Sequence, residues 1–281
     1  MVYTYLKLLY GYSKLLYYYS LYSVYGDNIF DDLTYVENVR SSIEKSGCMV
    51  IKSVQWFLPK ISVIYNLNNN LVTELNKLYD NCGVHNIEHT EYIYKNLFNK
   101  DLKDKYKILE ILGSGSIGQV YKIEDIHTNH IYALKVNHPN LDNEYKLFSL
   151  FIKSIYKIRQ LLYYAPIKDI NPLLEELQLQ LDLRNECNNN SLNKELYGNR
   201  DIIIIPNIYY ASKNLLLMEY IEGDKLSKDI GDYTYNKMVL CLIIFIISSA
   251  VYNLPIHGDL HCGNYKIVKD NDMYKLIIYD F

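Results

Sequence analysis

The C-terminal stretch, residues 254–281, holds three side chains whose order and spacing could support phosphoryl transfer. Asp259 is followed five residues later by Asn264, and a hydrophobic run then ends in Asp280. In phosphoryl-transfer sites one aspartate accepts the proton of the attacking hydroxyl, while an asparagine and a second aspartate hold magnesium. We therefore predict Asp259 as a catalytic residue, and Asn264 and Asp280 as Mg²⁺ ligands on either side of a short hairpin.

A glycine-rich run upstream could bind the phosphates. Gly113-Ser-Gly-Ser-Ile-Gly118 lies between two predicted strands, and the next strand carries Lys135. A lone Gly-x-Gly-x-x-Gly is weak, since dinucleotide folds share it, but there the glycines open a helix rather than a strand. Glycines admit phosphates close to the backbone, and Lys135 would supply positive charge to the α- and β-phosphates. The predicted nucleotide contacts here are Gly113, Ser114, Gly115, Ser116, Gly118, Val120, Ala133 and Lys135.

Two predicted helices follow, over 140–164 and 172–197. In the second, leucines form an apolar face, and Asp182 and Glu186 lie four positions apart, on one side of a helix. A kinase site requires one glutamate here to hold the strand lysine on the phosphates. We predict Glu186 in that catalytic role, and expect Glu175 and Glu176 to be solvated charges near the start of the helix.

Residues 202–210 and 215–223 predict two further strand regions. In a kinase the second would be the hinge, the segment that meets the adenine edge. Its backbone groups from Glu219 to Ile221 would bind the base, Met218 would gate the pocket behind it, and Gly223 would begin the large lobe. These three residues, Met218, Glu219 and Ile221, complete the predicted nucleotide contacts.

The composition excludes some functions and leaves others open. The net charge of −3 over 281 residues predicts no nucleic-acid partner. Five cysteines without metal or disulfide spacing suit a reducing compartment. The Leu- and Tyr-rich start, residues 1–25, predicts a helix packed on the body of the protein, with a membrane-surface helix as the alternative. The apolar run 238–252 is too short to span a bilayer and predicts a core helix.

The first hundred residues predict helices broken at 66–70 and 80–83. Within them, residues 46–60 predict a helix with one polar stripe, because Lys52 and Gln55 are three positions apart. By itself this pattern indicates an ordinary amphipathic helix.

Taken together, these motifs resemble the UbiB-type atypical kinases, the aarF-domain family, over residues 45–281. The segments that carry the resemblance are Lys135-Val-Asn-His-Pro139, Leu181-Asp-Leu-Arg-Asn-Glu186, Ile205-Pro206 with Met218-Glu-Tyr-Ile-Glu-Gly223, and His257-Gly-Asp-Leu-His-Cys-Gly-Asn264. The family's Lys-x-Gly-Gln motif has Val54 in place of glycine, its Glu-x-Asp has Gln180 in place of glutamate, and its Ala-rich loop is Gly-Ser-Gly-Ser. In the family these three motifs are thought to restrain phosphoryl transfer to proteins.

The resemblance implies an α+β, kinase-like bilobal fold with an N-terminal helical extension. It divides the chain into an extension with the Lys-x-x-Gln element (1–100), an N-lobe with a helical insertion (101–222) and a partial C-lobe with the catalytic loop (223–281). The C-lobe is expected to be incomplete, since the sequence ends at Phe281, before the glycine that follows in kinases. The implied cofactors are ATP and Mg²⁺. The implied locations are mitochondria or plastids, with possible association with membranes or lipids.

The implied activity is Mg²⁺-dependent phosphoryl transfer to an unknown protein or small-molecule acceptor, or ATP hydrolysis. Two alternatives stay open. The segment 257–264 is also similar to the loop of aminoglycoside and choline kinases, which would make the chain a small-molecule kinase. The early end of the chain would also suit a pseudokinase or scaffold that binds nucleotide without turnover.

Overall fold

A computed structural model describes most of the chain. The described residues are 2–64, 69–79, 83–161, 169–198, 202–251, 257, 260–271 and 273–280. Two residues singled out by their sequence motif, Asp259 and Phe281, lie outside them. The chain divides into two compact units. Unit 1 comprises Met1–Tyr92, Ile111–Val120 and Val136–Leu181, and unit 2 comprises Ile93–Glu110, Tyr121–Lys135 and Asp182–Phe281.

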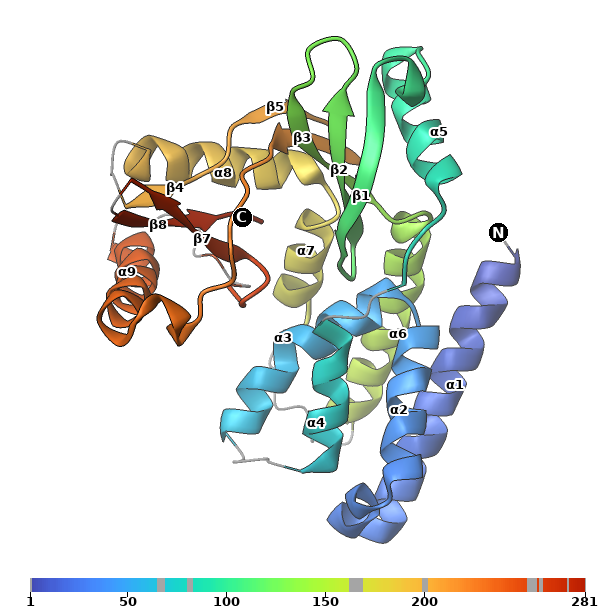
Figure 1. The fold of residues 1–281 in the computed structure, drawn as a ribbon. Helices are drawn as coiled ribbons and strands as arrows, with labels where there is room; N and C mark the ends of the chain where they lie inside the picture. The colour runs from blue at the N-terminus through green and yellow to red at the C-terminus, as the bar shows by residue number, and fades with distance from the viewer. Residues whose placement is uncertain are drawn as a thin grey trace. The chain divides into compact units, whose positions relative to one another are not determined.

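Unit 1 is built mainly from helices (Figure 1). They are α1 (Val2–Tyr25), α2 (Leu33–Lys45), α3 (Cys48–Ile64), α4 (Asn70–Asn76), α6 (Leu141–Leu161) and α7 (Asn171–Leu179), with 3₁₀ turns at Gly26–Asp31 and Lys77–Tyr79. The chain turns sharply between α1 and α2 because Asp32 caps α2, accepting hydrogen bonds from the backbone N–H groups of Thr34 and Tyr35. The helix α5 (Ile87–Phe98) continues from unit 1 into unit 2.

The polar stripe expected over 46–60 lies on α3, but it faces the interior of unit 1. Lys52 and Gln55 are both buried, each 8% exposed. Gln55 donates a hydrogen bond from Nε2 to the backbone carbonyl of Leu78 at 2.9 Å. The interpretation as an ordinary amphipathic helix, with its polar side in solvent, is therefore wrong. Both side chains are therefore part of the interior of the helical extension.

A five-stranded sheet follows the order β1-β2-β3-β6-β5. Its strands are β1 (Tyr106–Ser114), β2 (Gly118–Asp125), β3 (Ile131–Asn137), β5 (Ile208–Ala211) and β6 (Leu215–Glu219). Strands β5 and β6 are antiparallel, and their register shifts between Ile208 and Tyr210, as in a β-bulge. The strands predicted on either side of the run Gly113–Gly118, and the next strand with Lys135, are confirmed.

Unit 2 also contains a three-stranded sheet in the order β4-β8-β7 (Figure 1). The short β4 (Ile203–Ile204) runs parallel to β8 (Met273–Ile278), and β7 (Tyr265–Asp270) forms an antiparallel hairpin with β8. The helices of this unit are α8 (Leu183–Tyr197), α9 (Asp232–Val251) and 3₁₀ turns at Leu102–Asp104 and Lys228–Ile230. A core that includes Tyr197, Phe245 and Leu276 joins α8 and α9 to the hairpin.

The single helix expected over 172–197 is in fact two helices. The first, α7, ends at Leu179, and α8 begins at Leu183. Asp182 is the N-cap of α8 and accepts a hydrogen bond from the backbone N–H of Arg184. It therefore does not share a helix face with Glu186. A short polar side chain before a helical run satisfies orphan N–H groups, and at Asp182 this capping preference overrides the continuous apolar spacing.

Helix α9 is long and apolar enough to cross a membrane, and no other helix in the described parts of the chain meets the same criteria. One face of it packs inside unit 2 through Met238, Leu242, Phe245 and Ser249. Its other face exposes apolar side chains, namely those of Leu240, Ile243, Ile244, Ile246, Ile247 and Val251. The expectation of a core helix is thus correct for one face only.

Candidate active site

Three charged side chains that are far apart in the sequence meet in unit 2. Lys135, on β3, places its Nζ 2.7 Å from Oε2 of Glu186, in the first turn of α8. The same Nζ contacts a carboxylate oxygen of Asp280, just after β8. The side chains of Lys135 and Glu186 are 14% and 11% exposed, whereas that of Asp280 is 39% exposed. One lysine therefore holds two carboxylates, and one of them is open to solvent.

The opposite charges in this cluster shift one another's pKa values. Burial disfavours the charged form of Lys135, but attraction by Asp280 and then Glu186 more than offsets it, so the pKa of Lys135 is raised. Burial raises the pKa of Glu186 to about 7, with a contribution from the Asp280 charge, although Lys135 draws that pKa down. The lysine therefore stays protonated. Above the pKa of Glu186, two ionised carboxylates around one ammonium leave a surplus negative charge that suits a further cation.

The backbone holds Asp280 in place. Asp280 follows β8, and its φ angle of 67° lies in the left-handed region that non-glycine residues seldom adopt. The preceding residue, Tyr279, donates its N–H to the carbonyl of Asn264 at 3.1 Å. The ring of His257 donates from Nε2 to the carbonyl of Tyr279 at 3.0 Å. These bonds tie the segment that contains Asn264 to the end of β8, so a strained backbone is fixed where a functional carboxylate is expected.

The residues predicted to bind Mg²⁺ suit such an ion chemically. The Asn264 amide and the Asp280 carboxylate supply oxygen donors, the ligands that Mg²⁺ prefers. The backbone bond between Tyr279 and Asn264 brings the two segments together, and the surplus charge around Lys135 favours a cation at Asp280. Bound there, Mg²⁺ would neutralise phosphate charge. Asn264 itself is buried, at 6% exposed.

The predicted hinge follows the end of β6. The N–H of Glu219 donates to the carbonyl of Asn207 at 2.8 Å, so this N–H serves the sheet and not an adenine. The side chain of Glu219 also accepts a bond from the amide of Asn207 at 2.7 Å. Met218 and Ile221 are half-buried, and Ala133 on β3 is 6% exposed.

The glycines of the predicted phosphate loop differ in what surrounds them. A Cβ on Gly113 would meet nothing within 4 Å, and on Gly115 only the carbonyl of Gly118, at 3.7 Å. A Cβ on Gly118 would lie 2.9 Å from the carbonyl of Val136 on β3. Gly118 is thus required for strand packing, whereas space lies open beside Gly113 and Gly115, although the N–H of Gly115 donates to the carbonyl of Gly118 at 2.9 Å.

The other predicted loop residues are partly fixed by hydrogen bonds or burial. Ser114 donates its hydroxyl to the carbonyl of Gly83 at 2.9 Å. Ser116 is buried, and Val120 on β2 is half-buried. These residues and the glycines belong to unit 1, whereas Lys135, Glu186, Asn264, Asp280 and the hinge belong to unit 2. Asp259 lies outside the described residues.

Sequence reasoning missed a histidine relay that holds the glycine-rich turn in unit 1. His138 bonds from Nε2 to the carbonyl of Gly115 at 2.9 Å, and its Nδ1 lies 2.8 Å from Nδ1 of His85. The Nε2 of His85 lies 3.0 Å from the hydroxyl of Thr90. A carbonyl only accepts, so His138 donates to Gly115, His85 donates to His138, and Thr90 donates to His85. The only sequence signal was His138, in the segment after Lys135.

Burial favours the neutral form of both histidines in this relay. It lowers the pKa of His85 to about 4, and the neighbouring rings of His138 and His89 lower it further. Burial also lowers the pKa of His138. The arrangement allows at most one of the two rings to be protonated, because two protonated rings would direct N–H groups at each other across the contact between His85 and His138.

With this geometry in hand, comparison with known proteins identifies the family. A model of the ABC1 atypical kinase-like domain matches residues 77–281, well over half of the chain. The chain belongs to the ABC1 atypical kinase-like family. The resemblance to UbiB-type, aarF-domain kinases is therefore confirmed. The roles predicted for individual site residues, and the three-part domain division, stay predictions.

Relatives of this ABC1 chain occur in plants and fungi. The chloroplastic protein "activity of BC1 complex kinase 3" of Arabidopsis thaliana is 27% identical over 182 residues, which are 61% of this chain and 25% of the relative. The ABC1 family protein MCP2 of Saccharomyces cerevisiae is 23% identical over 231 residues, 72% of this chain and 40% of the relative. The chain thus spans between a quarter and two fifths of the length of these relatives.

A solved structure supports the fold of the ABC1 chain. The Mycobacterium tuberculosis protein Rv3197, in complex with erythromycin, has a TM-score of 0.52 at 20% sequence identity. The similarity covers 68% of this chain and 50% of that protein. At 20% identity this similarity is evidence for the fold alone, and it confirms the expected α+β, kinase-like class.

Proposed function

We propose that this chain binds ATP with Mg²⁺ and transfers or hydrolyses the terminal phosphate. The observation that carries the proposal is the cluster of Lys135, Glu186 and Asp280. A strand lysine held by a helix glutamate, together with an aspartate that follows a later strand, is the combination that protein kinases use for phosphoryl transfer. Membership of the ABC1 family points the same way.

In this proposal each residue has a separate task. Lys135 directs its charge at the α- and β-phosphates, and Glu186 fixes the direction of the lysine side chain. Asn264 and Asp280 hold Mg²⁺, which would offset the charge of the phosphates. The loop Gly113–Gly118 covers the phosphates with backbone N–H groups, and Asp259 orients the attacking hydroxyl or water. The adenine edge is read by backbone groups of Glu219 to Ile221 other than the N–H of Glu219, which bonds to Asn207.

The first test is thermal unfolding of the purified chain with ATP, with ATP plus Mg²⁺, and with GTP plus Mg²⁺. A ligand that binds only the folded state raises the melting temperature by mass action. We expect a rise with ATP that Mg²⁺ enlarges, and we expect Lys135→Ala and Asp280→Asn each to remove most of it. Lys103→Ala and Asp270→Asn serve as controls, because Lys103 is exposed and Asp270 pairs with Lys275 at the exposed end of the β7–β8 hairpin.

The second test separates an enzyme from a nucleotide-binding scaffold. We expect slow ATP hydrolysis by the wild-type chain, and its loss in Asp259→Asn with the ATP-induced thermal shift retained. No thermal shift at any ATP concentration, from a protein that melts cooperatively, would contradict the proposal of a nucleotide site. A shift without turnover in either protein would limit the function to binding. If the wild-type chain hydrolyses ATP, assays of hydroxylated small molecules and of proteins would identify the acceptor.

A further inference from the structure

Unit 2 contains a second concave site, away from the charged cluster. It is a pocket of about 280 Å³. The lining residues are Tyr94, Phe98, Lys105, Tyr106, Tyr132, Leu134, Tyr209, Tyr210, Leu215 and Leu217. They come from α5, the start of β1, and strands β3, β5 and β6, and all belong to unit 2. Its volume is near the lower end of the usual range for ligand sites, about 300–1,000 Å³.

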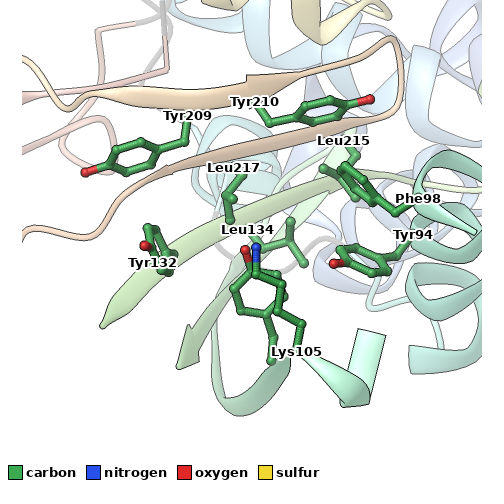
Figure 2. A pocket seen from close by; sticks show the side chains of 10 residues that line it. Tyr94, Phe98, Lys105, Tyr132, Leu134, Tyr209, Tyr210, Leu215 and Leu217 are labelled. Atoms are coloured by element: carbon green, nitrogen blue, oxygen red, sulfur yellow. The ribbon is translucent and has the colours of Figure 1, made fainter. Parts of the chain in front are cut away.

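The walls of this pocket are a continuous chain of aromatic rings. In order they are Tyr210, Phe98, Tyr94, Tyr106, Tyr132 and Tyr209, with successive ring centroids 4.8, 4.6, 6.1, 6.0 and 5.3 Å apart. In Figure 2, Tyr94 and Phe98 lie on one side of the pocket, and Tyr132 and Tyr209 lie on the other. Several contacts are edge-on, so rings mutually fix one another's orientation.

Backbone geometry directs these side chains into one space. Tyr132 and Leu134 alternate along β3 with Ala133 and Lys135, so the pocket lies on the sheet face opposite the one that Lys135 occupies. Neighbouring residues of a regular strand point to opposite faces, yet both Tyr209 and Tyr210 line the pocket. The register shift between Ile208 and Tyr210 explains this, since a bulge re-aims a side chain.

Lys105 brings a positive charge to an otherwise uncharged lining. It is the only ionised side chain among the ten lining residues, and Figure 2 shows its amine between the two aromatic walls. Its Nζ lies 5.1 Å from the centre of the Tyr106 ring. Among the described residues, Lys105 makes no ion pair with a carboxylate within 4.0 Å. The Lys105 ammonium lies beside the apolar floor of Leu134, Leu215 and Leu217, where a hydrogen bond with Tyr106 and the more distant charge of Asp125 raise its pKa.

We propose that this pocket binds a small, flat, apolar molecule that carries one carboxylate. The rings would stack on or edge against the apolar body, the leucines would form its floor, and Lys105 would pair with the carboxylate. The volume is about nine times the ~30 Å³ that one water occupies in the liquid, which is enough for a fused two-ring molecule, and the flat faces of the surrounding rings favour a flat occupant. An aromatic cage can also bind organic cations, but the charge of Lys105 opposes that use.

The test uses 2-naphthoate as the probe, followed by NMR of leucine methyl groups in the intact chain. Neutral 2-naphthalenemethanol and cationic 2-naphthylmethylamine have the same ring system and serve as comparisons. We expect shifts of the Leu134, Leu215 and Leu217 methyls at probe concentrations up to about 2 mM, because small ligands bind weakly. The carboxylate should bind more tightly than the alcohol, and the amine most weakly.

Matched variants separate charge from shape. Lys105→Met should weaken binding of 2-naphthoate about threefold to tenfold and leave the alcohol unchanged, while Lys103→Met, two positions away and outside the pocket, should change neither. Leu217→Phe should fill the pocket and weaken both probes, while Leu240→Phe on α9 should not. The proposal is overturned if folded wild-type protein shows no shift with 2-naphthoate, if the amine binds as tightly as the carboxylate, or if Lys105→Met has no effect. We expect 2-naphthoate to bind equally well in the presence of ATP, which would show that its pocket is separate from the proposed nucleotide site.

Discussion

At the scale of residues, the charged cluster depends on one lysine that satisfies two carboxylates. Glu186 is nearly buried beside Lys135, and Asp280 adds a second negative charge to the same ammonium. A buried charge that loses its partner destabilises the protein more than the intact pair stabilises it. The stability of unit 2 is therefore linked to the group that we propose binds phosphate.

We predict that Lys135→Met lowers the free energy of unfolding by about 2–4 kcal/mol, because the nearly buried Glu186 loses its counter-charge and is left beside the carboxylate of Asp280. Adding Glu186→Gln to that variant should restore part of the loss, since the repulsion is removed. Urea denaturation of both variants measures this, with Lys103→Met as the control at an exposed site. A loss no larger than that of the control would show that the cluster does not contribute to stability.

The histidine relay gives a prediction about pH at the same scale. Burial lowers the pKa of His85 from 6.5 to about 4, so the folded state binds fewer protons than the unfolded state in this interval. The stability that His85 contributes is fully present above about pH 6.5 and is lost as the pH falls toward 4, with a slope of at most about 1.4 kcal/mol per pH unit.

Urea denaturation of the wild type and His85→Asn at several pH values between 7 and 4 checks this. The wild type should be more stable at pH 7, and the difference should shrink as the solution becomes acidic. His89 and His138 lie in the same cluster, so the comparison with the variant isolates the share of His85. A difference that stays constant across the range would contradict the lowered pKa.

At the scale of elements, the connection that leaves β6 is fixed against β7. Asp224 and Ile267 exchange two backbone hydrogen bonds, of 2.8 and 2.9 Å. A Cβ on the preceding residue, Gly223, would lie 2.8 Å from the carbonyl of Ile267 and equally close to the side chain of Ile277. The absence of a side chain is thus what lets this segment approach the hairpin that leads to Asp280.

Gly223→Ala should therefore lower the free energy of unfolding by about 1–3 kcal/mol, the usual cost of overpacking. Gly83→Ala provides the control, because a Cβ there meets nothing within 4 Å. Thermal and urea unfolding of the two variants measure the effect. Equal stability of Gly223→Ala and Gly83→Ala would mean that the backbone moves apart without cost.

At the scale of the whole molecule, one surface is unusually apolar. Ile243, Ile247 and Val251 on α9 are 47%, 57% and 73% exposed. The opposite face of the helix is packed in the core of unit 2, so the exposed face cannot be buried by turning the helix over. Contiguous exposed apolar surface favours association.

We predict that the purified chain self-associates, and that the double variant Ile243→Lys and Ile247→Lys does so less, with little change in its free energy of unfolding. Sedimentation velocity over a range of concentrations measures the association. Phe245→Lys is the contrasting variant, because Phe245 is 1% exposed and a buried unpaired charge should unfold unit 2. Equal association of the wild type and the double variant would show that this face is not responsible.

The sequence by itself determined the order of strands and motifs, since glycine spacing, strand alternation and the Asp, Asn and Asp of the C-terminal stretch are local patterns. It also predicted Lys135 and Glu186 as partners, because the kinase template supplies their roles. Tertiary structure alone decided that Asp280 joins their ion pair, that Lys52 and Gln55 face inward, and that Asp182 ends one helix and starts another. It also decided the histidine relay and the aromatic pocket. Their members come from segments far apart in the chain, and only packing brings such side chains within hydrogen-bonding or van der Waals distance.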